Sequence, residues 1–238
     1  MEAVEEGSDR GMSDQELRDE VITMVLAGHE TTANLLSWTF YLLSKHPEIE
    51  ARVREEAQRV LGDRDPTLEA VKTLEYTRMV LDEALRLYPP AWIFERQTIA
   101  DDELGGFFVK KGSIVGISPY VLHRHPRYWE NPEGFDPERF RSKDASRPRW
   151  SYLPFGGGPR MCIGNHFALM EAQIILAMIV REHRLELDPS QPVIVDPVIT
   201  LRPKRGIFVR RRPSSHAARE SSRYPAPRRP NEPPAVFS

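Results

Sequence analysis

The sequence predicts a mainly α-helical fold that also contains small β-sheets. Apolar residues recur at helical spacing in four segments, and Ser, Pro or Gly near several of their ends give start and stop signals. These helical segments are residues 13–45, 47–61, 74–87 and 165–183. Short runs of β-branched and aromatic residues predict strands at 97–100, 107–109, 113–118, 185–187 and 206–210.

The first predicted helix is the longest. Ser13 and Glu16 form an S-x-x-E capping box at its start, and Pro47 forces a break after Lys45. Its apolar residues recur at helical spacing, and others lie on its remaining faces, so we expect the helix to be largely buried. The recurring positions are Leu17, Val21, Met24, Val25, Ala33, Leu36, Phe40 and Leu43.

Pro and Gly residues mark the ends of the segments that follow. The helix at 47–61 has Pro47 in its first turn and Gly62 just past its end, and Pro89 stops the helix at 74–87. Lys111-Gly112 marks a turn within 97–118, which we expect to form one small sheet. Residues 119–154 are rich in Pro, Asn and Arg and are unusually long for a loop without a function. We therefore expect this loop to wrap around another group.

The domain organisation follows from the ends of these patterns. Residues 1–12 indicate a flexible leader, residues 13–210 one domain, and residues 211–238 a disordered tail rich in Pro and Arg. The 33 Lys and Arg residues nearly balance the 35 Asp and Glu residues, which gives no reason to expect nucleic-acid binding. Without an apolar run of roughly 20 residues or a signal peptide, we expect a cytoplasmic location, although a segment before Met1 could carry a membrane anchor.

Cys162 is the single cysteine, which leaves it as an inert core thiol, a nucleophile or a lone metal ligand. It lies in the string FGGGPRMCIG, residues 155–164, just before a helix. Glycines there let the backbone approach a flat ligand and point N–H groups at the sulfur, while the helix N-terminus and Arg160 favour a thiolate. No Gly-Lys-Ser/Thr follows and G-x-G-x-x-G is not completed, which argues against a phosphate loop.

The string AGHETT, residues 27–32, is unusual inside a helix, because Gly there costs about 1 kcal/mol against Ala. Ala27 and Gly28 would let a diatomic ligand sit against the backbone, and a Thr hydroxyl could bond to a nearby carbonyl. The alternative is a helix-packing notch with polar residues that face solvent. A zinc site of the H-E-x-x-H type fails because position 33 is Ala33.

Four motifs in order resemble the cytochromes P450. The loop matches F-x-x-G-x-R-x-C-x-G at every fixed position, and AGHETT, EALR at 83–86 and PERF at 137–140 precede it in that family's order. The resemblance covers about residues 13–210. It implies the C-terminal portion of that fold, with the oxygen-binding helix, core helices, meander and cysteine-ligand loop.

The resemblance also implies the roles of single residues. Cys162 would be the axial ligand of the iron in haem b, and the other cofactor-binding residues would be Arg160, Arg96, Phe155, Gly156, Gly164, Ala27 and Gly28. Thr31 would hydrogen-bond dioxygen and its water, and Glu30 would relay protons, which makes these two the catalytic residues. Glu83, Arg86 and Arg139 would form a buried structural network. His123 and His125 have no apparent third ligand, so we interpret them as surface residues.

The activity implied is a haem monooxygenase that inserts one oxygen atom of dioxygen into an apolar substrate. Residues 92–94 and 198–200 match segments that line the substrate pocket. Electrons would come from NAD(P)H through a separate ferredoxin or flavoprotein reductase, because no flavin or iron–sulfur module is visible. The region that precedes the oxygen-binding helix in the family is missing, so faces of that helix should be exposed. A second hypothesis is therefore a catalytically inactive haem-binding remnant, or a half that needs a separate N-terminal part.

Overall fold

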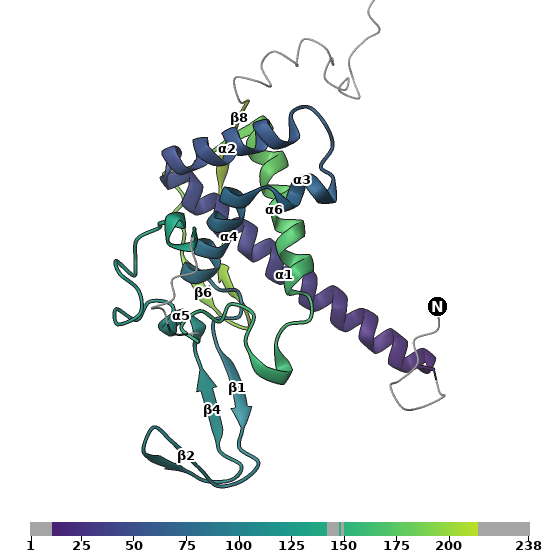
Figure 1. Cartoon of the computed structure of the whole chain (residues 1–238), viewed down its shortest axis with the longest axis vertical. Coiled ribbons are helices and arrows are strands. Elements are labelled where there is room, and N and C mark those ends of the chain that lie inside the picture. The colour runs from purple at the N-terminus through teal and green to yellow at the C-terminus, as the bar shows by residue number, and fades with distance from the viewer. Residues whose placement is uncertain (1–10, 142–147, 149, 214–238) are drawn as a thin grey trace, which may run out of the picture.

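The computed structural model describes residues 11–141, 148 and 150–213 (Figure 1). Its helices are α1 (Asp14–Lys45), α2 (Pro47–Leu61), α3 (Leu68–Lys72), α4 (Glu75–Leu87), α5 (Pro119–Leu122) and α6 (Asn165–Glu182), with 3-10 turns η1 (Pro137–Phe140) and η2 (Gly158–Arg160). Its strands are β1 (Phe94–Gln97), β2 (Asp102–Leu104), β3 (Phe107–Val109), β4 (Ile114–Ile117), β5 (His183–Leu187), β6 (Val195–Pro197), β7 (Leu201–Pro203) and β8 (Val209–Pro213). The mainly helical class with small sheets is confirmed.

The hydrophobic core lies among α2, α4, α6 and the C-terminal half of α1 (Figure 1). Val53 of α2, Leu81 of α4 and Leu176 of α6 are fully buried there. Trp38 of α1 stacks on Tyr88, with ring centroids 4.2 Å apart, and its indole N–H donates to the Leu201 carbonyl at 2.9 Å. Each buried apolar side chain of this size contributes about 1.5–3 kcal/mol, so these four helices hold the domain together.

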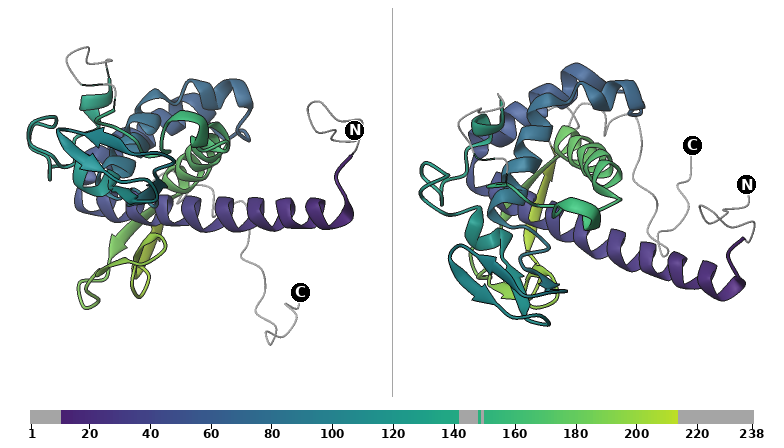
Figure 2. Two further views of the ribbon diagram at one scale, coloured as in Figure 1. Left: turned by 90° about the horizontal axis from the view of Figure 1, so that it is seen from below. Right: turned by 60° about the horizontal axis from the view of Figure 1, so that its bottom comes forward.

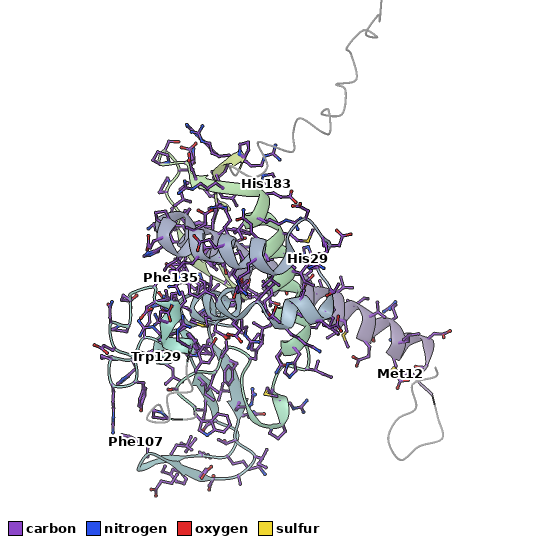
Figure 3. The ribbon with its side chains drawn as sticks, turned by 45° about the horizontal axis from the view of Figure 1, so that its top comes forward. Met12, His29, Phe107, Trp129, Phe135 and His183 are labelled. Atoms are coloured by element: carbon purple, nitrogen blue, oxygen red, sulfur yellow. The ribbon has the colours of Figure 1, made fainter. Side chains whose placement is uncertain are left out.

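Helix α1 begins as predicted, because the Ser13–Glu16 capping box is formed. The prediction that α1 is largely buried is wrong for its first half, since every described side chain of residues 14–30 is exposed. Its buried residues begin at Thr32, and the helix packs against α2, α4, α6, β5 and β7. In Figures 1 and 2 the first half projects from the body, and Figure 3 places Met12 at that outer end. The expectation that faces of this helix are exposed is therefore confirmed.

The strands form four separate antiparallel pairs, β1–β4, β2–β3, β5–β8 and β6–β7. The single sheet predicted within residues 97–118 is wrong, because that segment forms two pairs and its first strand lies earlier, at Phe94–Gln97. The β2–β3 hairpin extends away from the helices, with Phe107 at its end (Figure 3). Strands β2, β6 and β7 were missed because three residues containing charge or Pro give no alternating pattern.

The predicted ends of the domain are only partly visible. Strand β8 continues to Pro213 by pairing with β5, so residues 211–213 belong to a strand rather than to the expected tail. Residues 1–10 and 214–238 lie outside the described residues, and the leader and tail there stay predictions. Across 11–141, 148 and 150–213, no helix is both long and apolar enough to cross a membrane.

The predicted buried network holds the segment between β4 and the cysteine loop. Arg86 and Glu83 are fully buried and paired through two hydrogen bonds of 2.7 and 2.8 Å. Arg139 donates to Glu83 Oε1 at 3.0 Å, which confirms the expected trio. Arg86 also donates to the carbonyls of Pro132 and Gly134, at 2.6 and 2.8 Å, so one buried guanidinium fixes the path of the loop.

The prediction that His123 is a surface residue is wrong. Its side chain is fully buried rather than at the surface, because the loop folds back over α4 and the imidazole packs against Tyr152 and Trp129. His125 is exposed, as expected.

Candidate functional site

Cys162 lies between η2 and α6, and its side chain is exposed. Backbone hydrogen bonds shape its loop: the Cys162 N–H donates to the Phe155 carbonyl at 3.0 Å, and the Gly156 N–H donates to the Leu153 carbonyl at 3.1 Å. The loop therefore closes on itself behind the cysteine and leaves the thiol directed outward.

Two glycines make this turn possible. Gly156 and Gly158 have φ values of +70° and +72°, in the left-handed region where a Cβ atom is disfavoured. A Cβ atom at Gly164 would stand 3.9 Å from Cys162 Sγ, an ordinary van der Waals contact, so Gly164 lies directly beside the sulfur. The glycines at 156 and 158 thus follow from backbone conformation.

The AGHETT motif lies in the middle of α1, where Ala27, Gly28 and Glu30 are exposed. The Thr31 hydroxyl donates to the Ala27 carbonyl at 2.6 Å, the local bond that the sequence allowed. Apart from its chain neighbours and the nearby backbone of α1 itself, no described atom lies within 4 Å of a Cβ built at Gly28. Small residues therefore leave open space beside a Thr hydroxyl on one stretch of helix.

The Glu30 carboxylate has a partner that sequence reasoning missed. Thr200, in the turn between β6 and β7, donates its hydroxyl hydrogen to Glu30 Oε1 at 2.7 Å. The same hydroxyl accepts a hydrogen bond from Asn34 Nδ2 at 3.1 Å. The sequence placed Thr200 in a pocket-lining segment, but no local signal connects it with an acid 170 positions away.

The two segments expected to line a pocket meet in the structure. The Trp92 indole N–H donates to the Val198 carbonyl at 2.9 Å, and the Leu201 N–H donates to the Pro90 carbonyl at 2.9 Å. Ile199, at the tip of this turn, is 95 % exposed. The turn therefore joins the segment after α4 to the Glu30 region of α1.

The two predicted propionate ligands lie on different elements. Arg96 is on β1, where its Nη1 donates to the Glu95 carbonyl at 2.8 Å and its guanidinium lies over the Phe94 ring. Arg160 is exposed within η2, two residues before Cys162. Arg160 thus shares the cysteine loop, whereas the described contacts of Arg96 are local to its strand.

The residues around Cys162 fit a haem. The donor is one accessible soft sulfur, the type of ligand that holds haem iron in the thiolate class. Ile163, which follows it in the chain, and Phe167, in the first turn of α6, are 89 % and 65 % exposed, and exposed apolar side chains suit a flat macrocycle. In the described part of the chain, no group of three His, Cys, Asp or Glu residues could form an alternative metal site.

Comparison with known proteins identifies the family. The family model for cytochrome P450 matches residues 1–210. Cyclooctatin synthase of Streptomyces melanosporofaciens is 47 % identical over 193 residues, which cover 80 % of this chain and 42 % of that protein. Cyclooctat-9-en-7-ol 5-monooxygenase of the same organism is 45 % identical over 184 residues, covering 76 % of this chain and 40 % of that one.

A solved structure has the same architecture. The crystal structure of the cytochrome P450DA heme domain superposes with a TM-score of 0.85 at 35 % identity, over 90 % of this chain and 49 % of that chain. The chain therefore spans less than half the length of these relatives. From its family match, its relatives and its fold, this chain belongs to the cytochrome P450 family.

Proposed function

We propose that this chain is the C-terminal, haem-ligating portion of a monooxygenase in which the Cys162 thiolate is the axial ligand of haem b. The observation that carries the proposal is the exposed thiol in a loop closed by its own backbone hydrogen bonds. When bound, the haem would supply dioxygen binding and the transfer of one oxygen atom to a substrate.

The cysteine loop would hold the iron and orient the cofactor. Gly156 and Gly164 give the macrocycle access to the backbone and to the sulfur, and Phe155 accepts the hydrogen bond from the Cys162 N–H. Arg160 and Arg96 would each bind a propionate, because a guanidinium pairs well with a carboxylate. Both side chains are exposed.

The α1 motif would form the site for dioxygen. Ala27 and Gly28 would leave room for dioxygen against the helix, and Thr31 would accept a hydrogen bond from a water beside it. The Thr31 hydroxyl hydrogen is directed to the Ala27 carbonyl, so its oxygen lone pairs stay available to accept. Glu30 would relay protons, with its carboxylate held by Thr200.

The substrate would be a largely apolar organic molecule. The turn at 198–200 carries the exposed Ile199, and it is bonded to Trp92 of the other proposed lining segment. One relative is named cyclooctat-9-en-7-ol 5-monooxygenase, after an organic alcohol. Electrons would come from NAD(P)H through a separate ferredoxin or flavoprotein reductase.

The reduced carbon monoxide spectrum tests the ligand assignment. The purified chain is supplied with haem, reduced and exposed to carbon monoxide, and its Soret band is compared with that of Cys162→Ser. The wild type should show the long-wavelength band of a thiolate-ligated haem, and the Ser variant should lose it. Because the chain has one cysteine, the same band in the Ser variant would refute the assignment.

The exposed half of α1 favours a second possibility, that activity needs a separately supplied N-terminal part. Apolar side chains there are 47–69 % exposed, namely Leu17, Val21, Ile22, Met24, Val25 and Leu26. An apolar surface of this kind favours association with a covering partner. Co-expression with the N-terminal half of the Streptomyces synthase should then raise haem incorporation, whereas Val21→Glu should reduce that gain. A Soret band of equal size without the added N-terminal half would contradict this possibility.

A further inference from the structure

His123 contacts both the buried ion pair and the start of the cysteine loop. It follows α5, and its side chain is fully buried. Its carbonyl accepts a hydrogen bond from Arg86 Nη1 at 2.9 Å, and its Nε2 accepts one from the Leu153 N–H at 2.8 Å. One residue therefore receives bonds from α4 on one side and from the segment before Phe155 on the other.

Leu153 is the first link to the ligand. Its carbonyl accepts from the Gly156 N–H at 3.1 Å, and the Phe155 carbonyl accepts from the Cys162 N–H at 3.0 Å. Only Pro154 separates Leu153 from Phe155. A displacement of the Leu153 backbone would therefore move the carbonyl that holds the cysteine.

The bond to Leu153 requires a neutral imidazole, because Nε2 accepts only when it carries no proton. Burial, with a smaller contribution from the nearby charges of Arg86 and Arg124, lowers the pKa of His123 to about 3. The acceptor is thus present throughout the neutral range.

We infer that His123 is a positioning residue for Cys162, which it serves by fixing the backbone of Leu153 to the Glu83–Arg86 pair. The inference rests on the proposed role of Cys162 as the iron ligand. The inference means that the hydrogen-bond acceptor of His123, rather than its aromatic ring, holds the loop in place.

The competing explanation is packing alone. The His123 ring lies 5.1 Å from the Tyr152 ring and 6.4 Å from the Trp129 ring, so an aromatic filler could account for its burial. Two substitutions separate the explanations. His123→Phe keeps an aromatic ring and loses the acceptor, whereas His123→Gln keeps an acceptor and loses the ring.

The first readout is backbone amide hydrogen exchange in the haem-free chain. In His123→Phe the amides of Leu153 and Cys162 should exchange about tenfold faster, the effect of losing one hydrogen bond of about 1.4 kcal/mol. The amide of Leu176 in α6 should be unchanged, which reports on the core. His123→Gln should keep exchange at Leu153 and Cys162 within about threefold of the wild type, as expected when a polar acceptor is retained.

The second readout is the reduced carbon monoxide spectrum of the haem-loaded variants. His123→Phe should lose most of the thiolate-type band and His123→Gln should retain it. If Phe leaves loop exchange unchanged, or if Phe and Gln speed exchange equally in the loop and at Leu176, the inference is wrong. Should the Phe variant not fold, free exchange at Leu153 in a folded Gln variant overturns it as well. A thiolate-type band that survives Cys162→Ser would instead refute the ligand assignment and leave the exchange result standing.

Discussion

Thr200 donates its hydroxyl hydrogen to Glu30 Oε1 at 2.7 Å, and this bond ties the turn between β6 and β7 to the middle of α1. A hydroxyl has one hydrogen to donate, and Asn34 Nδ2 approaches its oxygen at 3.1 Å, so the direction of both bonds is set. Because Thr200 and Asn34 are both buried, this is a fixed polar junction between the proposed substrate segment and the proposed proton relay.

Removing the Thr200 hydroxyl should destabilise the chain. Thr200→Val leaves the buried Asn34 amide without its acceptor, which costs about 1–3 kcal/mol. Urea denaturation measures the loss in the free energy of unfolding. Thr200→Ser retains the hydroxyl and is the matched control, for which we expect less than half the loss. Equal losses in both variants would mean that the methyl group, and not the hydrogen bond, is what matters.

Removing one partner of the buried ion pair should be severe. Arg86→Leu removes the two hydrogen bonds that Arg86 donates to the fully buried Glu83 carboxylate, which costs about 3–5 kcal/mol. We expect the cooperative thermal unfolding transition, monitored by circular dichroism, to be largely lost. Arg141→Leu, which breaks a surface contact with Glu138, should change the transition little. Similar transitions for both variants would contradict the burial argument.

His123 should make stability depend on pH. Its folded pKa is about 3 and its ordinary value is 6.5, so the unfolded chain binds the proton first as the pH falls. The contribution of neutral His123 to the free energy of unfolding is complete above pH 6.5. It is lost progressively as the pH falls toward 3, by at most about 1.4 kcal/mol per pH unit. Urea midpoints between pH 7 and 4.5 measure it, and His123→Gln should flatten that slope. An unchanged slope in the Gln variant would assign it to other groups.

Gly28 should show opposed effects on stability and on the proposed function. Gly28→Ala adds a Cβ that would meet no other described element within 4 Å, so the helix should gain up to about 1 kcal/mol. If the space beside Thr31 admits dioxygen, the same methyl group should weaken carbon monoxide binding to the haem-loaded chain. Ala33→Gly, also exposed on α1, is the control that should lower stability and leave binding alone. Weaker binding in the control alone would remove Gly28 from the proposed site.

The sequence by itself determined the features that depend on neighbours in the chain. The Ser13–Glu16 box starts α1 because its two partners are three positions apart, and Pro47 marks the next helix because it lacks an N–H. The cysteine loop was predictable for the same reason, since Gly156 and Gly158 are needed where φ is positive.

Tertiary structure alone decided which distant segments meet. The exposure of the first half of α1 depends on what packs beside it, so an apolar pattern predicted burial that the structure does not have. Thr200 beside Glu30 and Leu153 beside His123 join residues 170 and 30 positions apart, and a hydrogen bond over such a separation leaves no periodic trace in the sequence. Local spacing fixes backbone conformation, whereas the partner of a buried polar group depends on how the whole chain packs.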